Sequence, residues 1–200
     1  MAKTLEIRDA CPTYDDGLAA SRYIDMASEG GIRMALGRRY ADIIATAFME
    51  PDHDLSYENT LFAVQDSAVV GMVSGYRTTA HKTTKFDPLR KASGNRLRRS
   101  LGLAMLGMVF GVLGSHDDGD YYVAFAGVNE DLRGQGVGTM LLGALEQRAR
   151  TAHCARFTIE VSARNDRAHR LYERLGWTVE SRWPRAKILP PVVYRMAREL

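Results

Sequence analysis

A glycine-rich segment in the second half of the chain contains the residue types that bind phosphate. It reads Arg133-Gly-Gln-Gly136-Val-Gly138-Thr139 and lies between an apolar stretch and an amphipathic stretch. The start of a helix leaves backbone N–H groups without intrahelical partners and carries partial positive charge, so it attracts anions. Glycines let a phosphate approach the backbone closely, and an arginine can add a charge-assisted bond. The segment therefore predicts a site for a phosphate-bearing ligand.

Two common nucleotide-binding loops fit this segment less well. A Walker loop ends in Gly-Lys-Ser/Thr, whereas this loop ends in Val137-Gly138-Thr139. A dinucleotide fingerprint needs G-x-G-x-x-G, and the spacing of these glycines does not supply it. Glu160 follows about 20 residues later, as a ribose-binding acid would, but it falls in the middle of an expected strand. The pattern disfavours both kinds of nucleotide site.

The segments around this loop have the periodicities of alternating strands and helices. Tyr121–Val128 is a continuous apolar run of strand length, typical of a strand covered on both faces. Apolar residues recur at helical spacing over Val137–Leu145, and Phe157–Val161 alternates as a strand does. A short helix is expected over Ala168–Leu175, with Asn165 as its N-cap. The glycine loop therefore opens a helix that follows a central strand.

The flanking segments supply further strands and helices. The dipeptide at positions 66 and 67 separates two β-rich runs, which is typical of an antiparallel hairpin. The expected elements are a strand at Lys3–Ile7, helices at Asp15–Gly30 and Arg38–Met49, hairpin strands at Leu61–Gln65 and Ala68–Tyr76, and strands at Trp177–Arg182 and Val192–Ala197. We therefore predict a mixed α/β fold.

The composition fits a folded chain and argues against several classes of partner. With 200 residues, of which 46% are hydrophobic, the chain is long enough to bury a core as one domain. A formal net charge of +3 gives no reason to expect nucleic acid as a partner. The two cysteines, Cys11 and Cys154, do not have the spacing of metal ligands, and the histidines are scattered. No metal is therefore expected. The first residues lack the apolar core of a secretory signal, which makes the cytoplasm the expected compartment.

Two motifs together resemble those of the GNAT superfamily of N-acetyltransferases. The first, Arg133-x-x-Gly136-x-Gly138, is similar to the family's acyl-CoA pyrophosphate loop, Arg/Gln-x-x-Gly-x-Gly/Ala. The second, Asn-x-x-Ala-x-x-Leu-Tyr-x-x-x-Gly-Trp over Asn165–Trp177, resembles the family's Asn-x-x-Ala-x-x-Leu-Tyr-x-x-x-Gly-Phe. The motifs occur in the family's order, and each falls on the expected kind of element.

The resemblance implies a GNAT-like acyl-CoA N-acyltransferase fold. Its central sheet would be mostly antiparallel and flanked by helices, with a helical insertion around 80–118. A single domain over residues 1–200 is expected to consist of an N-terminal strand, two helices and a hairpin (1–78), the insertion (79–118), an acetyl-CoA-binding core (119–182) and a C-terminal strand (183–200).

The resemblance also assigns roles to individual residues. It implies that backbone N–H groups of the glycine loop hold the pyrophosphate of acetyl-CoA. Ala126 and Val128 would hydrogen-bond the pantetheine arm through their backbones, and the N–H of Val128 would polarise the thioester carbonyl. Tyr172 would protonate the departing sulfur as the catalytic acid. The expected cofactor-binding residues are Ala126, Val128, Arg133, Gly134, Gly136, Val137, Gly138, Thr139, Asn165 and Tyr172.

Three of these residues also have purely structural interpretations. By spacing alone, Tyr172 fits a half-buried core position on the stripe of its helix. Asn165 can serve as an N-cap without touching the cofactor, and Arg133 can stabilise the loop instead of binding phosphate.

The general base is not identified by the sequence. Many members of the resembled family carry a glutamate on the central strand, but Tyr121–Val128 contains no acid. His53, Asp54 and Glu58 precede the hairpin and can act through water, attract a cationic amine or form a plain surface connection. We therefore name no base.

The resemblance implies transfer of an acetyl group from acetyl-CoA to a primary amine on a small molecule or a protein, by direct attack on the thioester. The alternative is a non-catalytic acyl-CoA-binding or sensor domain. The apolar run Leu101–Leu113 follows several basic residues and can lie on a membrane surface, but it is shorter than the about 20 residues that span a bilayer. We expect no stable membrane insertion, and this run instead favours a helix over the acceptor cleft or in a homodimer. The identity of the amine and the acyl-chain preference are open.

Overall fold

A computed structural model describes residues 4–80, 87–94, 119–186 and 188–200 of the chain. Seven strands form one sheet in the order β1-β2-β3-β4-β5-β7-β6. Neighbouring strands are antiparallel except for β4 and β5, which run parallel. The strands are β1 (Leu5–Asp9), β2 (Thr60–Gln65), β3 (Ala68–Arg77), β4 (Asp120–Val128), β5 (Arg156–Ser162), β6 (Thr178–Trp183) and β7 (Val193–Glu199). The prediction of a mixed, mostly antiparallel sheet is confirmed.

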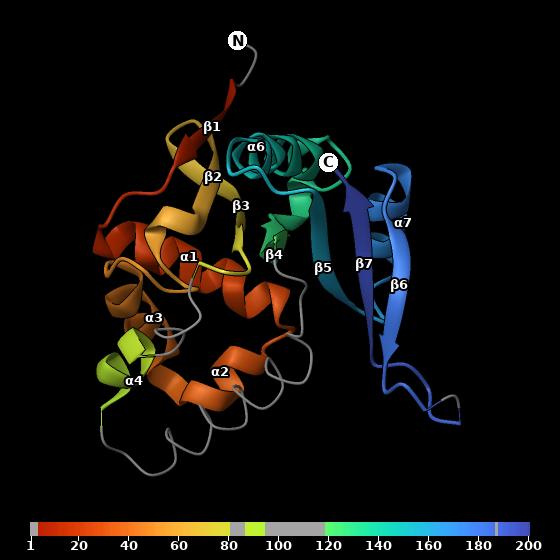
Figure 1. Ribbon diagram of the computed structural model, residues 1–200. Coiled ribbons are helices and arrows are strands. Elements are labelled where there is room, and N and C mark those ends of the chain that lie inside the picture. Colours follow the sequence, from red (N-terminus) through yellow and green to blue (C-terminus); the bar gives the residue numbers. More distant parts are fainter. Residues whose placement is uncertain (1–3, 81–86, 95–118, 187) are drawn as a thin grey trace.

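Helices cover both faces of this sheet. The described helices are α1 (Tyr14–Ala27), α2 (Gly31–Leu36), α3 (Tyr40–Phe48), α4 (Asp87–Ser93), α6 (Val137–Thr151) and α7 (Asp166–Arg174). In Figure 1, strands β1–β3 lie on the left and β5, β7 and β6 on the right, with β4 between them. The helices α6 and α7 carry apolar side chains into one core and α1 and α3 into another, so the sheet is buried from both sides.

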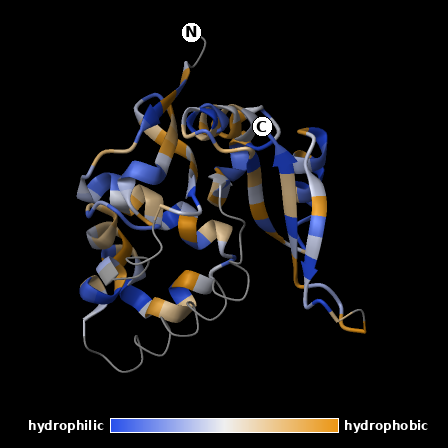
Figure 2. Ribbon diagram, in the orientation of Figure 1, coloured by the Kyte–Doolittle hydropathy of each residue, from blue (hydrophilic) through white to orange (hydrophobic). Residues whose placement is uncertain are grey.

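Alternation along the strands sorts the side chains between these two cores. Tyr121 and Val123 of β4 belong to the core under α6, together with Phe157, Ile159 and Val161 of β5. The intervening residues of both strands point to the opposite face, as the two-residue period of a strand requires. Figure 2 shows the resulting mixture of hydrophobic and hydrophilic residues along individual strands and helices.

The first helix is shorter than expected and is followed by a helix that was not expected. A side-chain oxygen of Thr13 accepts a hydrogen bond from the Asp16 N–H and starts α1. Helix α1 ends at Ala27, and positive φ angles of 53° at Glu29 and 83° at Gly30 then redirect the chain into α2. A helix of six residues is too short to show a clear apolar period, so α2 could not be predicted from periodicity.

Close packing of α1 against α3 depends on one glycine. A Cβ atom placed on Gly17 would lie 2.6 Å from the Cα atom of Ala45. No side chain larger than hydrogen fits at that distance, so this glycine sets how closely the two helices approach.

The expected helical insertion lies mostly outside the described residues. Helix α4 is its described part, and Leu89 of α4 is buried in the core formed by α1 and α3. The apolar run Leu101–Leu113, with its membrane-surface and dimer interpretations, also lies outside them. Within the described part of the chain, no helix has the length and apolar character needed to cross a membrane.

Candidate active site

The central feature of the site is a divergence of the two parallel strands. Four residue pairs join β4 to β5, from Asp120 opposite Arg156 to Val123 opposite Ile159. Beyond Val123, no pairing between β4 and β5 continues in the described residues. At the same point the register between β3 and β4 shifts, which leaves Ala124 as an extra residue on β4. Such a bulge bends its strand, so β4 turns away from β5.

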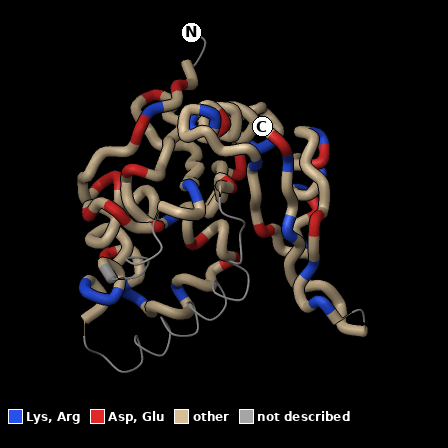
Figure 3. Tube along the Cα trace, viewed as in Figure 1, with Lys and Arg blue, Asp and Glu red and all other residues tan. Residues whose placement is uncertain are grey.

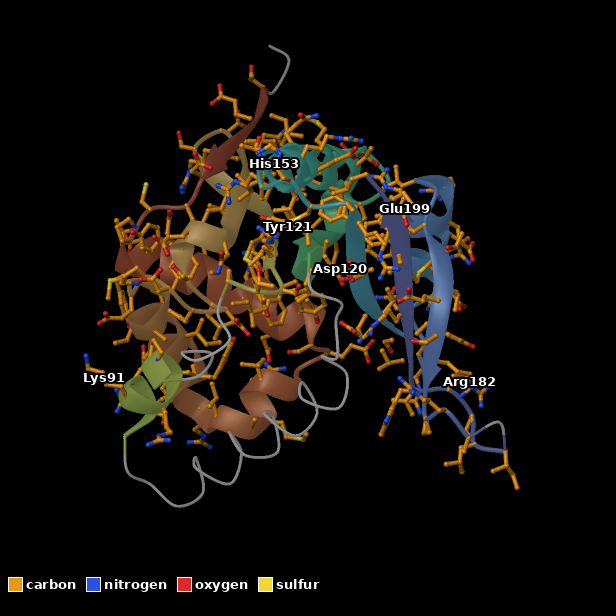
Figure 4. All side chains as sticks on the ribbon, in the orientation of Figure 1. Lys91, Asp120, Tyr121, His153, Arg182 and Glu199 are labelled. Carbon is orange, nitrogen blue, oxygen red and sulfur yellow. The ribbon has the colours of Figure 1, made fainter. Side chains whose placement is uncertain are left out.

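An ion pair closes one end of this split. The Arg156 guanidinium donates to both carboxylate oxygens of Asp120, at 3.1 Å from Nε and 3.0 Å from Nη2. Its Nη1 donates to Glu180 Oε1 at 3.0 Å. The Asp120 side chain, labelled in Figure 4, is only 6% exposed, and a bidentate arginine holds a buried carboxylate firmly. This contact fixes β4 to β5 where their pairing begins.

The backbone of Ala126 and Val128 faces the open end of the split. Asn129 donates its N–H to the carbonyl of Val70 on β3, at 2.9 Å. Within an antiparallel pair, every second residue directs both its N–H and its C=O to the same neighbour. The groups of Val128 and Ala126 therefore point away from β3, toward β5. This is the orientation that the sequence resemblance implies for binding a pantetheine arm.

A cavity of about 750 Å³ occupies the split and extends to the glycine loop. Nine of the ten expected cofactor-binding residues line it: Ala126, Val128, Arg133, Gly134, Gly136, Gly138, Thr139, Asn165 and Tyr172. The tenth, Val137, has its side chain buried in the core against β3. Only the backbone N–H of Val137 is therefore suited to contact a ligand.

The glycine loop opens α6 as the sequence predicts. Gly134 and Gly136 have φ angles of 81° and 88°, and Gly136 is the N-cap of α6 with no side-chain cap. The first helical bond runs from the Met140 N–H to the Gly136 carbonyl at 3.0 Å, so the N–H groups that precede Met140 lie in the uncapped first turn. A Cβ atom added to Gly136 would meet no atom within 4 Å. The space beside this first turn is open.

Two arginine side chains lie close to the glycine loop. Arg133 donates from Nε to the Val128 carbonyl at 3.2 Å and from Nη1 to Glu130 at 3.2 Å. It therefore stabilises the end of β4 and the loop, and its contact with phosphate stays a prediction. On α7, by contrast, Arg167 places Nη2 3.7 Å from where a Cβ of Gly134 would lie.

Arg167 belongs to a basic stripe on α7, formed by Arg167, Arg170 and Arg174, that was not predicted from the sequence. Arg167, Arg170 and Arg174 all line the cavity, and Figure 3 shows the basic residues along α7. Spacings of three and four residues place side chains on one face of a helix, and that spacing was the available signal. The stripe supplies positive charge next to the glycine loop.

The second motif forms a capped helix with a buried tyrosine. Asn165 Oδ1 accepts a hydrogen bond from the Ala168 N–H at 3.0 Å, which confirms the N-cap. Tyr172 is 4% exposed, and its ring packs against Trp177 with centroids 5.4 Å apart. Burial raises the pKa of the Tyr172 phenol well above its usual value, so the hydroxyl stays protonated at neutral pH. Tyr172 is therefore both a core residue and a lining residue of the cavity.

The acidic connection before the hairpin lies apart from the cavity lining. The His53 ring is buried, with Nε2 2.9 Å from the Ala47 carbonyl and Nδ1 accepting from the Leu55 N–H at 3.3 Å. Glu58 accepts from the Asp52 N–H at 3.0 Å and so organises the loop. Neither His53 nor Glu58 is placed to receive a proton from a substrate in the cavity.

Comparison with known proteins identifies the fold family. A profile described as Acetyltransferase (GNAT) family matches residues 35–177, which is more than half of the chain. The chain belongs to the GNAT acetyltransferase family. Solved structures with the same fold include one described as an acetyltransferase, at 21% identity and a TM-score of 0.69, covering 97% of this chain and 98% of that one.

Two further structures extend the comparison of this GNAT chain. An N-acetyltransferase from Staphylococcus aureus Mu50 has 17% identity and a TM-score of 0.66, covering 96% of this chain and 100% of that one. A NatC complex bound to Gag peptide and CoA has 15% identity and a TM-score of 0.56, covering 98% of each chain. At these identities the likeness shows the fold, and the family match supports an acyltransferase.

The described part of the GNAT domain holds no group of three or more His, Cys, Asp or Glu side chains arranged to bind a metal ion. Cys11 is exposed and Cys154 is buried, each as a free thiol.

Proposed function

We propose that this GNAT chain transfers an acetyl group from acetyl-CoA to a primary amine by direct attack on the thioester. The observation that carries the proposal is a continuous cavity that joins the glycine loop at the start of α6 to the split between β4 and β5. A ligand in this cavity has a phosphate-binding end and an end beside free strand backbone, as a coenzyme A thioester requires.

The residues present fit acetyl-CoA at each end of the cavity. The open space beside Gly136 accommodates a diphosphate at the N–H groups of the first turn of α6. Arg167 adds a positive charge above the loop, and Ala126 and Val128 offer backbone groups to the amide-containing arm. Acetyl-CoA supplies the activated acyl group, and the chain's own residues orient it.

The attacking nitrogen needs its lone pair. An alkylamine with a pKa of about 10.4 is neutral only about 0.04% of the time at pH 7, so the free-energy cost of deprotonating it is about 4.6 kcal/mol. The nitrogen then forms a bond to the carbonyl carbon, and the Val128 N–H stabilises the charge that develops on oxygen.

Tyr172 completes the transfer. As the C–S bond breaks, its phenol donates a proton to the departing thiolate. The attacking nitrogen loses one proton to solvent and Tyr172 regains one from solvent, giving the amide and free coenzyme A. Burial keeps this hydroxyl protonated at neutral pH, so its O–H is present to donate toward the sulfur. Asn165 helps by fixing the start of α7, the helix that carries Tyr172.

The alternative is a domain that binds acyl-CoA without turning it over. The absence of an acid within Tyr121–Val128 favours this alternative. Release of free thiol from acetyl-CoA separates the two, measured with spermidine, tyramine, lysine, kanamycin and a peptide with a free N-terminus. The peptide is included because one structural neighbour is a NatC complex bound to Gag peptide and CoA. Thiol release with any of these amines supports the enzyme, whereas acetyl-CoA binding with no release across the panel supports the sensor.

A further inference from the structure

Exposed hydrophobic side chains gather on the connection between β6 and β7. This β6–β7 loop spans residues 184–192, all described except residue 187, and it extends away from the helices in Figure 1. Of the large hydrophobic side chains that are exposed in the described part of the chain, four lie on this loop or directly beside it: Trp183, Ile188, Leu189 and Val192. Ile188 is 91% exposed, and Figure 2 shows hydrophobic residues at the end of the hairpin. Exposed apolar side chains that gather in one place indicate a binding surface.

Hydrogen bonds within the loop give it a defined shape. The Val192 N–H donates to the Trp183 carbonyl at 2.8 Å and closes the base of the loop, and the Leu189 N–H donates to the Ala186 carbonyl at 3.1 Å. The Arg182 guanidinium, labelled in Figure 4, donates from Nη2 to two carbonyls, those of Ala186 at 2.9 Å and Leu189 at 2.7 Å. The apolar side chains are therefore presented to solvent by an internally bonded loop.

The backbone of the loop has few polar groups that depend on water. Pro184, Pro190 and Pro191 have no N–H donor. The carbonyls of Ala186 and Leu189 already accept hydrogen bonds from within the hairpin. Unpaired backbone groups make a loop costly to transfer from water to an apolar environment. This loop therefore costs less to transfer than an ordinary polar turn.

The charges around the loop are positive. The loop and the end of β6 contain Arg182, Arg185 and Lys187, and the sequence has no Asp or Glu from Ser181 to Arg198. Arg185 is exposed beside the apolar side chains. Basic residues next to exposed apolar residues are typical of surfaces that bind anionic phospholipid, because the headgroups attract the charges while the apolar side chains leave water.

The size of the patch favours a lipid surface over a protein partner. Its four large hydrophobic residues expose about 400–500 Å², which is about half of the roughly 800 Å² that each partner contributes to a standard protein–protein interface. A lipid interface needs no matching surface, since apolar side chains enter it to a depth of about 5–10 Å at the boundary between headgroups and acyl chains.

We propose that the β6–β7 loop attaches the chain to membranes that contain anionic phospholipid. Trp183, Ile188 and Leu189 enter the interface, and Arg185 lies among the headgroups. The attachment is peripheral and reversible, and it involves no segment that spans the bilayer. It goes beyond the proposed function and does not depend on it.

The test is co-sedimentation of the wild-type chain with vesicles of phosphatidylcholine, either alone or with about 30% phosphatidylserine. We expect the chain to bind the anionic vesicles about 10- to 100-fold more tightly than the neutral ones, and less tightly at high salt. Fluorescence reports whether the loop enters the interface, because Trp183 is 42% exposed whereas Trp177, the second tryptophan, is 3% exposed in the core. Anionic vesicles should shift the emission to shorter wavelength, and Trp183→Phe should bind them without this shift.

Substitutions separate the apolar and the charged contributions. Ile188→Asn should weaken binding to the anionic vesicles about 10-fold. The matched control is Met34→Asn, because Met34 of α2 is 81% exposed and lies on a different element; binding should change less than about twofold. Arg185→Gln should weaken binding to the anionic vesicles about fivefold and leave binding to the neutral ones unchanged. All three side chains are exposed, so the variants should melt at the temperature of the wild type.

The outcomes are decisive in either direction. Absence of wild-type binding to the anionic vesicles, or equal effects of Ile188→Asn and Met34→Asn, would overturn the inference. Binding without a change in Trp183 emission would also overturn it, because the loop would then stay outside the interface. A wild-type dimer in solution that Ile188→Asn dissociates would assign the loop to a second copy of the chain instead. Acetyl transfer is measured separately with the amine panel, so failure of this inference leaves the proposed function in place.

Discussion

Substitution of Gly136 tests the phosphate site through charge alone. The residue has a φ of 88° and caps α6, and a Cβ there meets no atom within 4 Å. Asn and Asp have nearly the same size and both tolerate the left-handed region better than other residues, at a cost of about 1–2 kcal/mol. Gly136→Asn is therefore the control for Gly136→Asp, and the two variants differ by one negative charge beside the first turn of α6.

The magnitude follows from Coulomb's law. A diphosphate bound at this turn carries about two negative charges at about 5 Å from the new carboxylate, and an effective dielectric constant of about 40 gives about 1.7 kcal/mol for each pair. The total of about 3 kcal/mol corresponds to about 200-fold in affinity. Because the loop is at the surface, salt should reduce this difference.

The assay is calorimetric titration of acetyl-CoA into both variants at about 0.05 and 0.5 M salt, with melting temperatures to check folding. We expect the two variants to melt at similar temperatures and Gly136→Asp to bind about 200-fold more weakly than Gly136→Asn at low salt. Equal affinities of Gly136→Asp and Gly136→Asn would refute the placement of the diphosphate.

Four further outcomes are expected. Tyr172→Phe should lower kcat about 10- to 100-fold with little change in acetyl-CoA affinity, because the lost proton acts only as the sulfur departs; steady-state kinetics and calorimetry check this. Arg167→Gln should weaken acetyl-CoA binding and reduce its dependence on salt concentration, whereas unchanged affinity would remove this residue from the site. Gly17→Ala should lower the free energy of unfolding by about 2 kcal/mol, since the added Cβ would overlap the backbone of α3; denaturant titration measures it. Burial raises the pKa of Asp16, but the hydrogen bonds from Arg8 and the Cys11 N–H lower it by more, so the pKa of Asp16 in the folded protein lies below the unfolded value. The ionised carboxylate therefore stabilises the fold at neutral pH, and this contribution is lost as the pH falls through the folded pKa. The free energy of unfolding of Asp16→Asn should consequently fall less steeply with pH below about pH 4 than that of the wild type.

The order of elements in the second half could be predicted because local rules determine it. The glycine loop, the N-cap at Asn165 and the alternation along β5 are short-range signals, and the structure has all three. The split between β4 and β5 could not be predicted, because no period in the sequence says where two paired strands diverge.

The roles of charged side chains could not be predicted in the same way. Arg133 is in the motif, yet its guanidinium binds the Val128 carbonyl, whereas Arg167 outside the motif approaches the loop. Glu160 has the sequence spacing of a ribose-binding acid, but its contacts with Arg195 and Tyr122 depend on strands that are distant in sequence. Such partners are set by sheet order, which a single sequence does not specify.

The last residue pair between β4 and β5, Val123 opposite Ile159, also places a pivot at one end of the cavity, and the Asp120–Arg156 ion pair holds the two strands together behind it. Val128 lies five residues beyond the last β4–β5 pair at Val123, a length of about 16 Å at about 3.3 Å per residue. A rotation of β5 by about 5° about that pivot would change the width of the opening at Val128 by about 1.4 Å, which is close to the length of one methylene group. For the acyl-CoA donor proposed here, we therefore expect the acyl-chain length that fits to depend on the packing around Arg156, although Arg156 lies far from the position proposed for the thioester carbonyl.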